Sequence, residues 1–172
     1  VICSDNGIGL GPDQTKAFVT KDTSYKDYLK IQGIGECKGS GRIQYLLYFS
    51  HMNILSIYKN GSEFISKTLD FSDKSTKEID EKSFKEQKTS DTTIGFEIKL
   101  SALKDEPFMH IQKQGNIETL FSAEKVRNHV LVFFLQRLVT LKEQIGNFEI
   151  LFESTYKDKI EKTALRAGDL PS

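Results

Sequence analysis

The residues best suited to chemistry come first in the chain, where an acidic side chain and two glycines follow a short apolar run. Val1-Ile2-Cys3-Ser4 is typical of a buried strand, and Asp5-Asn6-Gly7 is a turn signal directly after it. Gly9 adds a second glycine two residues later. A carboxylate between a strand and two glycines is suited to accept a hydrogen bond from the amino group of a base, while the backbone approaches closely. The pattern Asp5-x-Gly7-x-Gly9 therefore indicates a candidate nucleobase site.

A second glycine cluster lies further along the chain and has a cation on each side. Lys38-Gly39-Ser40-Gly41-Arg42 leads into a predicted helix over residues 42–49, with Ser40 as its N-cap. Glycines that open a helix suit phosphate groups, because they offer bare amides, the positive end of the helix dipole and little steric bulk. Taken singly, each of the two clusters fits an ordinary tight turn better than a ligand site.

None of the glycine clusters matches the two common phosphate-binding motifs. The dinucleotide fingerprint G-x-G-x-x-G fails because its last glycine would fall on Pro12, Lys38 or Gln44. The P-loop pattern also fails, since a start at Gly33 would place its second glycine on Lys38. These motifs therefore do not explain the glycines.

Taken in this order, with a polar stretch between them, the two clusters resemble those of the Bergerat-fold ATPases. This superfamily contains gyrase B, the Hsp90 chaperones, histidine kinases and the mismatch-repair protein MutL. Asp5-Asn6-Gly7-Ile8-Gly9-Leu10 resembles its D-x-G-x-G box, and residues 35–42 resemble its second glycine box in the K-G-x-G-R form. Asp91-Thr92-Thr93-Ile94 is similar to the strand that closes the adenine pocket, although Asp91 stands where glycine is usual. Residues 124–127, the long helix after them and residues 148–153 resemble the end of an Hsp90-like nucleotide domain.

The resemblance implies a role for each motif residue in holding ATP or ADP. Asp5 would accept the adenine amino group, partly through water, and Thr92 would support that water and Asp5. Gly7 and Gly9 would let the wall of the adenine pocket come close, and residues 21–38 would form a lid. The phosphates would bind to amides of Gly39, Ser40 and Gly41, with Lys38 and Arg42 as nearby cations.

The resemblance also implies a preceding helix that carries an Mg²⁺-binding asparagine and a glutamate base for hydrolysis. Only four residues precede Asp5, so we expect that an N-terminal part is missing and that this chain lacks both groups. We expect an Hsp90-like ATPase that uses Mg²⁺, and its partners would be ATP and a possible homodimer or downstream domain. The alternatives are the catalytic domain of a histidine kinase, and a non-hydrolysing nucleotide sensor or interaction domain. Residues before position 1 would separate these hypotheses.

Composition excludes several other classes of protein. The 172 residues carry 24 basic and 24 acidic side chains, a net charge of +0, which argues against a protein that mainly coats nucleic acid or a membrane surface. Mean hydropathy is −0.39, and no apolar run approaches the ~18 residues of a membrane span. Two cysteines, Cys3 and Cys37, and no signal peptide favour a reducing compartment, so we expect a cytoplasmic protein. The three histidines lack metal-ligand spacing, and no metal ligand is assigned.

Hydrophobic periodicity predicts the elements that would position these residues. We expect a short helix over residues 15–20, a core helix over residues 42–49, and a hairpin of residues 54–59 and 64–69 around Asn60-Gly61. Residues 72–90 are interpreted as a solvated excursion, and residues 92–100 as a strand. Ser122 would cap a long helix with a core stripe that includes Phe133 and Phe134, and residues 148–152 would form a last strand.

The predicted fold class is α+β. It is a two-layer sandwich with the Bergerat arrangement, in which a mixed, mainly antiparallel sheet carries helices on one face. Residues 1–172 are interpreted as a single nucleotide-binding domain that is incomplete at its N-terminus. The alternative is a nucleotide-binding domain over residues 1–120, followed by the start of another domain over residues 121–172.

Overall fold

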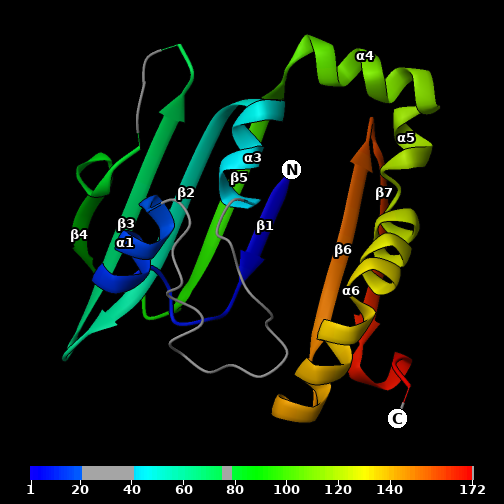
Figure 1. Ribbon diagram of the computed structural model, residues 1–172. Coiled ribbons are helices and arrows are strands. Elements are labelled where there is room, and N and C mark those ends of the chain that lie inside the picture. The colour runs from blue at the N-terminus through cyan, green and yellow to red at the C-terminus, as the bar shows by residue number, and fades with distance from the viewer. Residues whose placement is uncertain (21–40, 75–78, 172) are drawn as a thin grey trace. The chain divides into compact units, whose positions relative to one another are not determined.

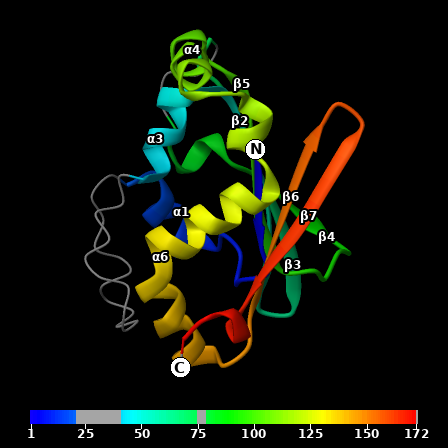
Figure 2. The ribbon, with the colours of Figure 1, turned by 90° about the vertical axis from the view of Figure 1, so that its right-hand side faces the viewer.

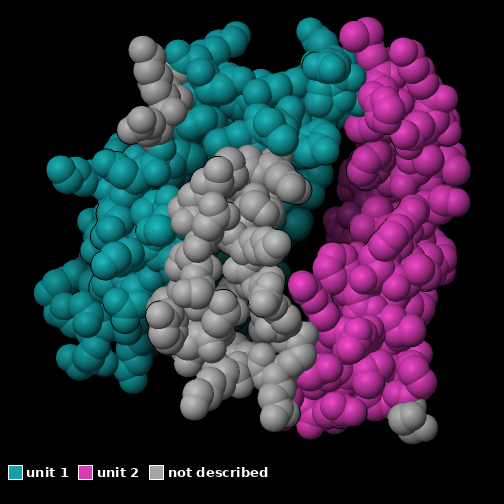
Figure 3. Space-filling model, in the orientation of Figure 1, with its two compact units in different colours: residues 1–28, 36–107 teal, residues 29–35, 108–172 magenta. Residues whose placement is uncertain are grey.

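The protein is a mixed α/β structure whose described residues form two compact units. The computed structural model describes residues 1–20, 41–74 and 79–171. Five α-helices, an antiparallel sheet of five strands and a separate two-stranded sheet occur in these ranges. The first unit contains described residues up to Pro107, and the second begins at Phe108 (Figure 3). Each unit has its own hydrophobic cluster.

The first unit is built on the five-stranded sheet, in the order β1-β5-β2-β3-β4 (Figure 1). All neighbouring strands are antiparallel. The predicted hairpin is confirmed, because β2 and β3 pair from Asn60 opposite Glu63 back to His51 opposite Ser72. Gly61 in its turn has φ +61°, the left-handed conformation that glycine tolerates best. The strands are β1 (Ile2–Asp5), β2 (Phe49–Asn60), β3 (Glu63–Ser72), β4 (Lys85–Thr89) and β5 (Gly95–Leu103).

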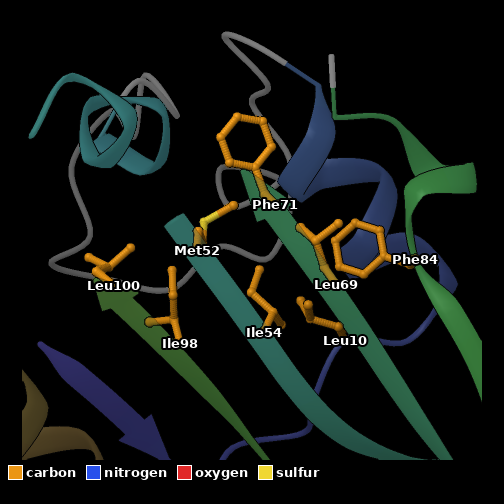
Figure 4. Packing of buried hydrophobic residues seen from close by; sticks show 8 residues of the cluster. All are labelled: Leu10, Met52, Ile54, Leu69, Phe71, Phe84, Ile98 and Leu100. Atoms are coloured by element: carbon orange, nitrogen blue, oxygen red, sulfur yellow. The ribbon is translucent and has the colours of Figure 1, made fainter. Parts of the chain in front are cut away.

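Two helices pack on one face of this sheet. Alternate residues of β2, β3 and β5 point to that face and form its buried cluster (Figure 4). Helix α1 (Pro12–Val19) contributes Phe18 and Val19 to the edge of the cluster, and α3 (Gly41–Tyr48) contributes Leu46. Pro12 occupies the first helical position of α1, where the missing N–H costs nothing. The buried members are Leu10, Met52, Ile54, Leu69, Phe71, Phe84, Ile98 and Leu100.

A buried lysine links α1 to the sheet. The side chain of Lys67 on β3 is 3% exposed, and its Nζ donates to Thr15 Oγ1 at 2.6 Å. It also forms an ion pair with Glu86 on β4 at 2.7 Å and lies 5.2 Å from the ring centroid of Tyr58. Burial raises the pKa of the Tyr58 hydroxyl, and the charge of Glu86 and a hydrogen bond to it raise the pKa further. Because the Lys67 ammonium group needs both Thr15 and Glu86 as partners, these contacts fix the position of α1 on the sheet.

The interpretation of residues 72–90 as a solvated excursion is right for most of the described side chains, which are exposed, but wrong in excluding a strand and a core residue. The described part of this segment contains a 3-10 turn, η1 (Glu81–Ser83), and the edge strand β4. Asp80 caps η1 by accepting the Ser83 N–H at 2.9 Å, and this turn brings Phe84 into the core. Phe84 meets Phe18 of α1 edge to face, with ring centroids 6.0 Å apart. Phe84, with Ile79 packed at the edge of the same cluster, therefore anchors this segment on the core.

Three further expectations about burial and strand limits need correction. Strand β1 forms as expected, but its side chains are exposed because it is an edge strand in the described structure. Helix α3 also forms, yet Leu47 is 67% exposed, so this helix covers the core with one side only. The strand expected over residues 92–100 begins at Gly95 and runs to Leu103, because pairing with β1 and β2 starts only there.

The second unit consists of three helices and a β-hairpin. Its long helix α6 (Ala123–Ile145) runs along the hairpin of β6 (Glu149–Tyr156) and β7 (Lys159–Arg166) (Figures 1 and 2). The predicted cap is confirmed, since Ser122 Oγ accepts the Lys125 N–H. Gly146 ends the helix with φ +75°. The other elements are α4 (Asp105–Gln114), which spans the boundary between the units, α5 (Ile117–Leu120) and η2 (Ala167–Asp169).

The core of the second unit is small and lies between α6 and the hairpin. Leu138, Leu165 and Leu170 are buried there, with Val130 and Phe148 among the residues packed around them. The expectation that Phe133 and Phe134 form part of a core stripe is wrong, because they are 76% and 47% exposed. The apolar residues of α6 surround the helix, and the hairpin covers only one side. No described helix combines the length and the apolar character needed to span a membrane.

The two ion pairs between β3 and β4 allow a matched test of the buried lysine. We expect Glu86→Gln to lower the free energy of unfolding by on the order of 3 kcal/mol, because it leaves the Lys67 charge buried without its counter-ion. Glu63→Gln removes the partner of Lys88, which is 73% exposed, and should cost less than ~1 kcal/mol. Urea unfolding followed by circular dichroism measures both, and equal losses would contradict the role assigned to Lys67.

Candidate functional site

The candidate site begins at the end of β1, where Asp5 faces the helix-covered side of the sheet. Asp5 lies opposite Phe96 in the register of β1 and β5, and directly opposed residues share a face. Phe96 packs against the core cluster, which sets the side to which Asp5 points. The Oδ1 atom of Asp5 accepts the Gly7 N–H at 2.8 Å. Among the described residues, Oδ2 has no hydrogen-bond partner, so one acceptor oxygen is available to a ligand.

A buried hydroxyl holds the loop that follows Asp5. Ser56 on β2 is 1% exposed, and its Oγ accepts the Leu10 N–H at 2.8 Å. The same hydroxyl donates to the Gly95 carbonyl oxygen at 2.9 Å. One side chain therefore joins the end of the loop to β2 and β5. The sequence analysis missed Ser56, although a serine that alternates with Ile54 and Tyr58 on the buried side of a strand was a usable signal.

Two glycines are required by close backbone approaches at this place. Gly9 has φ +73°, and a Cβ atom on it would lie 2.3 Å from the Ile57 carbonyl oxygen. A Cβ atom on Gly95 would lie 2.5 Å from the Asp5 carbonyl oxygen. Gly9 was predicted from the motif, whereas Gly95 was missed because it looked like an ordinary strand residue. Gly7 differs from both, since its added Cβ would meet only the Asp5 side chain, at 2.9 Å.

Only part of the second glycine box lies within the described residues. Lys38, Gly39 and Ser40 fall outside them, while Gly41 and Arg42 are the first two residues of α3. Burial raises the pKa of the Tyr45 hydroxyl on this helix, and the nearby Cys3 thiol raises it further. Cys3 precedes Asp5 by two residues on β1, so α3 lies over the same side of the sheet as the candidate site. Lys104 holds the other end of α3 by donating to the Leu46 carbonyl at 2.7 Å.

The structure places Thr92 in the connection before β5 rather than in a strand. Thr92 is exposed, and no hydrogen bond within the described ranges joins it to Asp5. Asp91 stabilises the turn in this connection, because its Oδ1 accepts the Thr93 N–H at 2.8 Å. That backbone hydrogen bond, with one from the Thr93 side chain, holds the pKa of Asp91 below its usual range. The residues that face Asp5 directly are Gly95 and Phe96.

In residues 1–20, 41–74 and 79–171, no group of three His, Cys, Asp or Glu side chains is placed to hold a metal. Asp5 is the acidic side chain of the site, and one of its oxygens is already engaged by Gly7. Mg²⁺ therefore has no assigned ligand here, and we attribute no chemical step to it.

Comparison with known proteins does not place the chain in a family. No protein-family model matches the sequence, and no curated protein matches it.

Gly9 and Gly61 both have positive φ, so alanine variants at the two positions can separate the cost of a steric clash from the cost of the backbone conformation. Gly61→Ala should cost about 1–2 kcal/mol, the penalty of a left-handed conformation, because nothing lies within 4 Å of its added Cβ. Gly9→Ala carries the same penalty and adds a clash with the Ile57 carbonyl, so we expect a clearly larger loss of unfolding free energy. Chemical denaturation of the two variants gives the comparison. A Gly9→Ala loss no greater than that of Gly61→Ala would show that the loop does not sit against β2.

Proposed function

We propose that the first unit binds an adenine nucleotide, ATP or ADP, in the manner of the Bergerat-fold ATPases and most like an Hsp90-like nucleotide domain. The observation that carries the proposal is the Asp5 carboxylate, with one oxygen held by Gly7 and the other available on the helix-covered side of the sheet. The loop beneath it is fixed by Ser56, so the acceptor oxygen is positioned before a ligand arrives.

The chemistry of the acceptor favours adenine over guanine. Adenine carries an exocyclic amino donor at the position where guanine carries a carbonyl oxygen. A carboxylate oxygen pairs with the first and repels the second. Because Asp5 Oδ1 accepts the Gly7 N–H, Oδ2 is the oxygen that would distinguish adenine from guanine. A guanine nucleotide would leave this carboxylate oxygen unpaired, so it should bind much more weakly than an adenine nucleotide.

The arrangement of the first unit also supports the Bergerat assignment. The resemblance implies a mainly antiparallel sheet with helices on one face, and α1 and α3 pack on the same buried cluster. It also implies a helix after the second glycine box, and α3 begins at Gly41.

The remaining parts of the proposal depend on the resemblance alone. Phosphates would bind the Lys38 to Arg42 segment, which ends in the first turn of α3 and its positive dipole end. Residues 21–38, the proposed lid, lie outside the described residues. ATP hydrolysis with Mg²⁺, a cytoplasmic setting, and coupling to a homodimer or downstream domain belong to the same proposal. The general base and the Mg²⁺ ligand are not assigned to any residue of this chain.

Replacement of Asp5 by asparagine tests the proposed adenine contact. In Asp5→Asn the amide oxygen can keep the Gly7 N–H, which leaves the amide nitrogen, a donor, facing the adenine amino group. The mismatch should cost ~1–3 kcal/mol, or roughly 5- to 150-fold in ADP affinity. Isothermal titration calorimetry with ADP measures the change, and GTP should bind the unmodified chain poorly.

Asp13→Asn provides the matched control, because Asp13 is an exposed carboxylate in the first turn of α1. Its ADP affinity should equal that of the unmodified chain. Equal ADP affinity for Asp5→Asn and the unmodified chain would overturn the adenine contact. An absence of ADP binding to the unmodified chain would overturn the proposed function itself.

A further inference from the structure

Helix α6 carries apolar side chains on the side that faces away from the hairpin. Val132 is 70% exposed and Phe133 is 76% exposed, in the middle of the helix. A shallow hollow lies beside them, lined by Lys125, Asn128, His129, Val132 and Phe133. The His129 ring stacks on the Phe133 ring, with centroids 5.9 Å apart and ring planes at 3° to each other. Exposed apolar groups gathered in this way mark an interaction surface.

The charges on this side of α6 follow a symmetric pattern. Lys125 and Glu143 are 143 − 125 = 18 residues apart, which is five turns at ~3.6 residues per turn, so they lie on one line of the helix about 27 Å apart. Val132 lies close to the same line, about 20° away at ~100° per residue. The midpoint of this line lies at the height of residue 134, with Val132 and Gln136 about 20° to either side of the line and Phe133 and Leu135 about 80° to either side. We call this surface the α6 stripe; it runs from a cation past Val132 and Gln136 to an anion, with Phe133 and Leu135 on its flanks.

We propose that the α6 stripe binds the α6 stripe of a second copy of this chain, with the two helices antiparallel. A two-fold axis at the midpoint places Lys125 of each copy opposite Glu143 of the other, which forms two equivalent ion pairs. Under this axis, one flank of the first helix lies beside the same flank of the second helix. Phe133 therefore meets Phe133 of the second copy. Residues 135–143 of one helix then cover the hollow beside residues 125–133 of the other.

The charge pattern selects this occupant over others. A parallel copy would bring Lys125 against Lys125 and Glu143 against Glu143, which is unfavourable at both ends. An acidic or a basic peptide would match one end of the stripe and oppose the other. A reversed copy of the same helix matches both ends and covers Val132 at the centre and Phe133 on the flank. This inference does not depend on nucleotide binding.

A charge-swap experiment tests the pairing in the whole chain. Sedimentation over a concentration series should show a species of twice the 19.6 kDa chain mass for the unmodified protein. Lys125→Glu and Glu143→Lys should each remove it, because like charges then meet at both ends of the stripe. The double variant Lys125→Glu/Glu143→Lys should restore it, since both ion pairs re-form with reversed sign. Phe133→Ser should also abolish the dimer.

Lys159→Glu makes the same charge change on an exposed residue of β7 and should leave the dimer unchanged. Far-UV circular dichroism confirms that each variant is folded, and restoration by the double variant excludes misfolding as the cause. Monomers at every concentration would overturn the proposal, as would a dimer that the single charge reversals leave intact. Loss of stability in a monomeric Phe133→Ser variant would assign the stripe to another part of the same chain and also overturn it.

Discussion

The hydroxyl of Ser56 is the contact on which the candidate site depends, because it bonds to two backbone groups from different segments of the chain. The hydroxyl accepts the Leu10 N–H and donates to the Gly95 carbonyl oxygen, so three segments meet at one buried group. The loop can lie this close to β2 only because Gly9 has no side chain. Asp5 lies at the start of the same loop, and its carboxylate, which accepts the Gly7 N–H, is therefore positioned in part by contacts several residues away.

The position of α1 depends on a second buried polar contact. Lys67 carries its charge into the space between α1 and the sheet, where Thr15, Glu86 and Tyr58 surround it. An apolar residue at position 67 would pack without specifying which turn of α1 lies above it, whereas an ammonium group needs its oxygen partners in place. Thr15 Oγ1 in turn donates to the Gly11 carbonyl at 2.9 Å. Lys67 is thus connected through Thr15 and the Gly11 carbonyl to the loop that Ser56 holds.

The second unit is stabilised differently, with a small core and an outer face that remains apolar. The α6 sequence has apolar residues all around the helix, and Leu138, Leu165 and Leu170 account for one side only. Arg127 strengthens that side by donating to the Ala164 carbonyl at 2.7 Å and pairing with Asp169. The other side keeps Val132 and Phe133 exposed between charges of opposite sign. A helix of this kind is stabilised further by a partner on its second face.

Local patterns were enough to predict the hairpin at Asn60-Gly61, the Ser122 cap at the start of α6 and the turn after Asp5, because turns and caps are read from neighbouring residues. The same reasoning missed β7 and misjudged Phe84, Phe133 and the start of β5, since burial and strand limits depend on what packs or pairs from elsewhere in the chain. Ser56, Gly95 and Lys67 show the physical reason most clearly. Their partners lie 39 to 52 residues away, and only the tertiary structure brings those backbone and side-chain groups within hydrogen-bond distance.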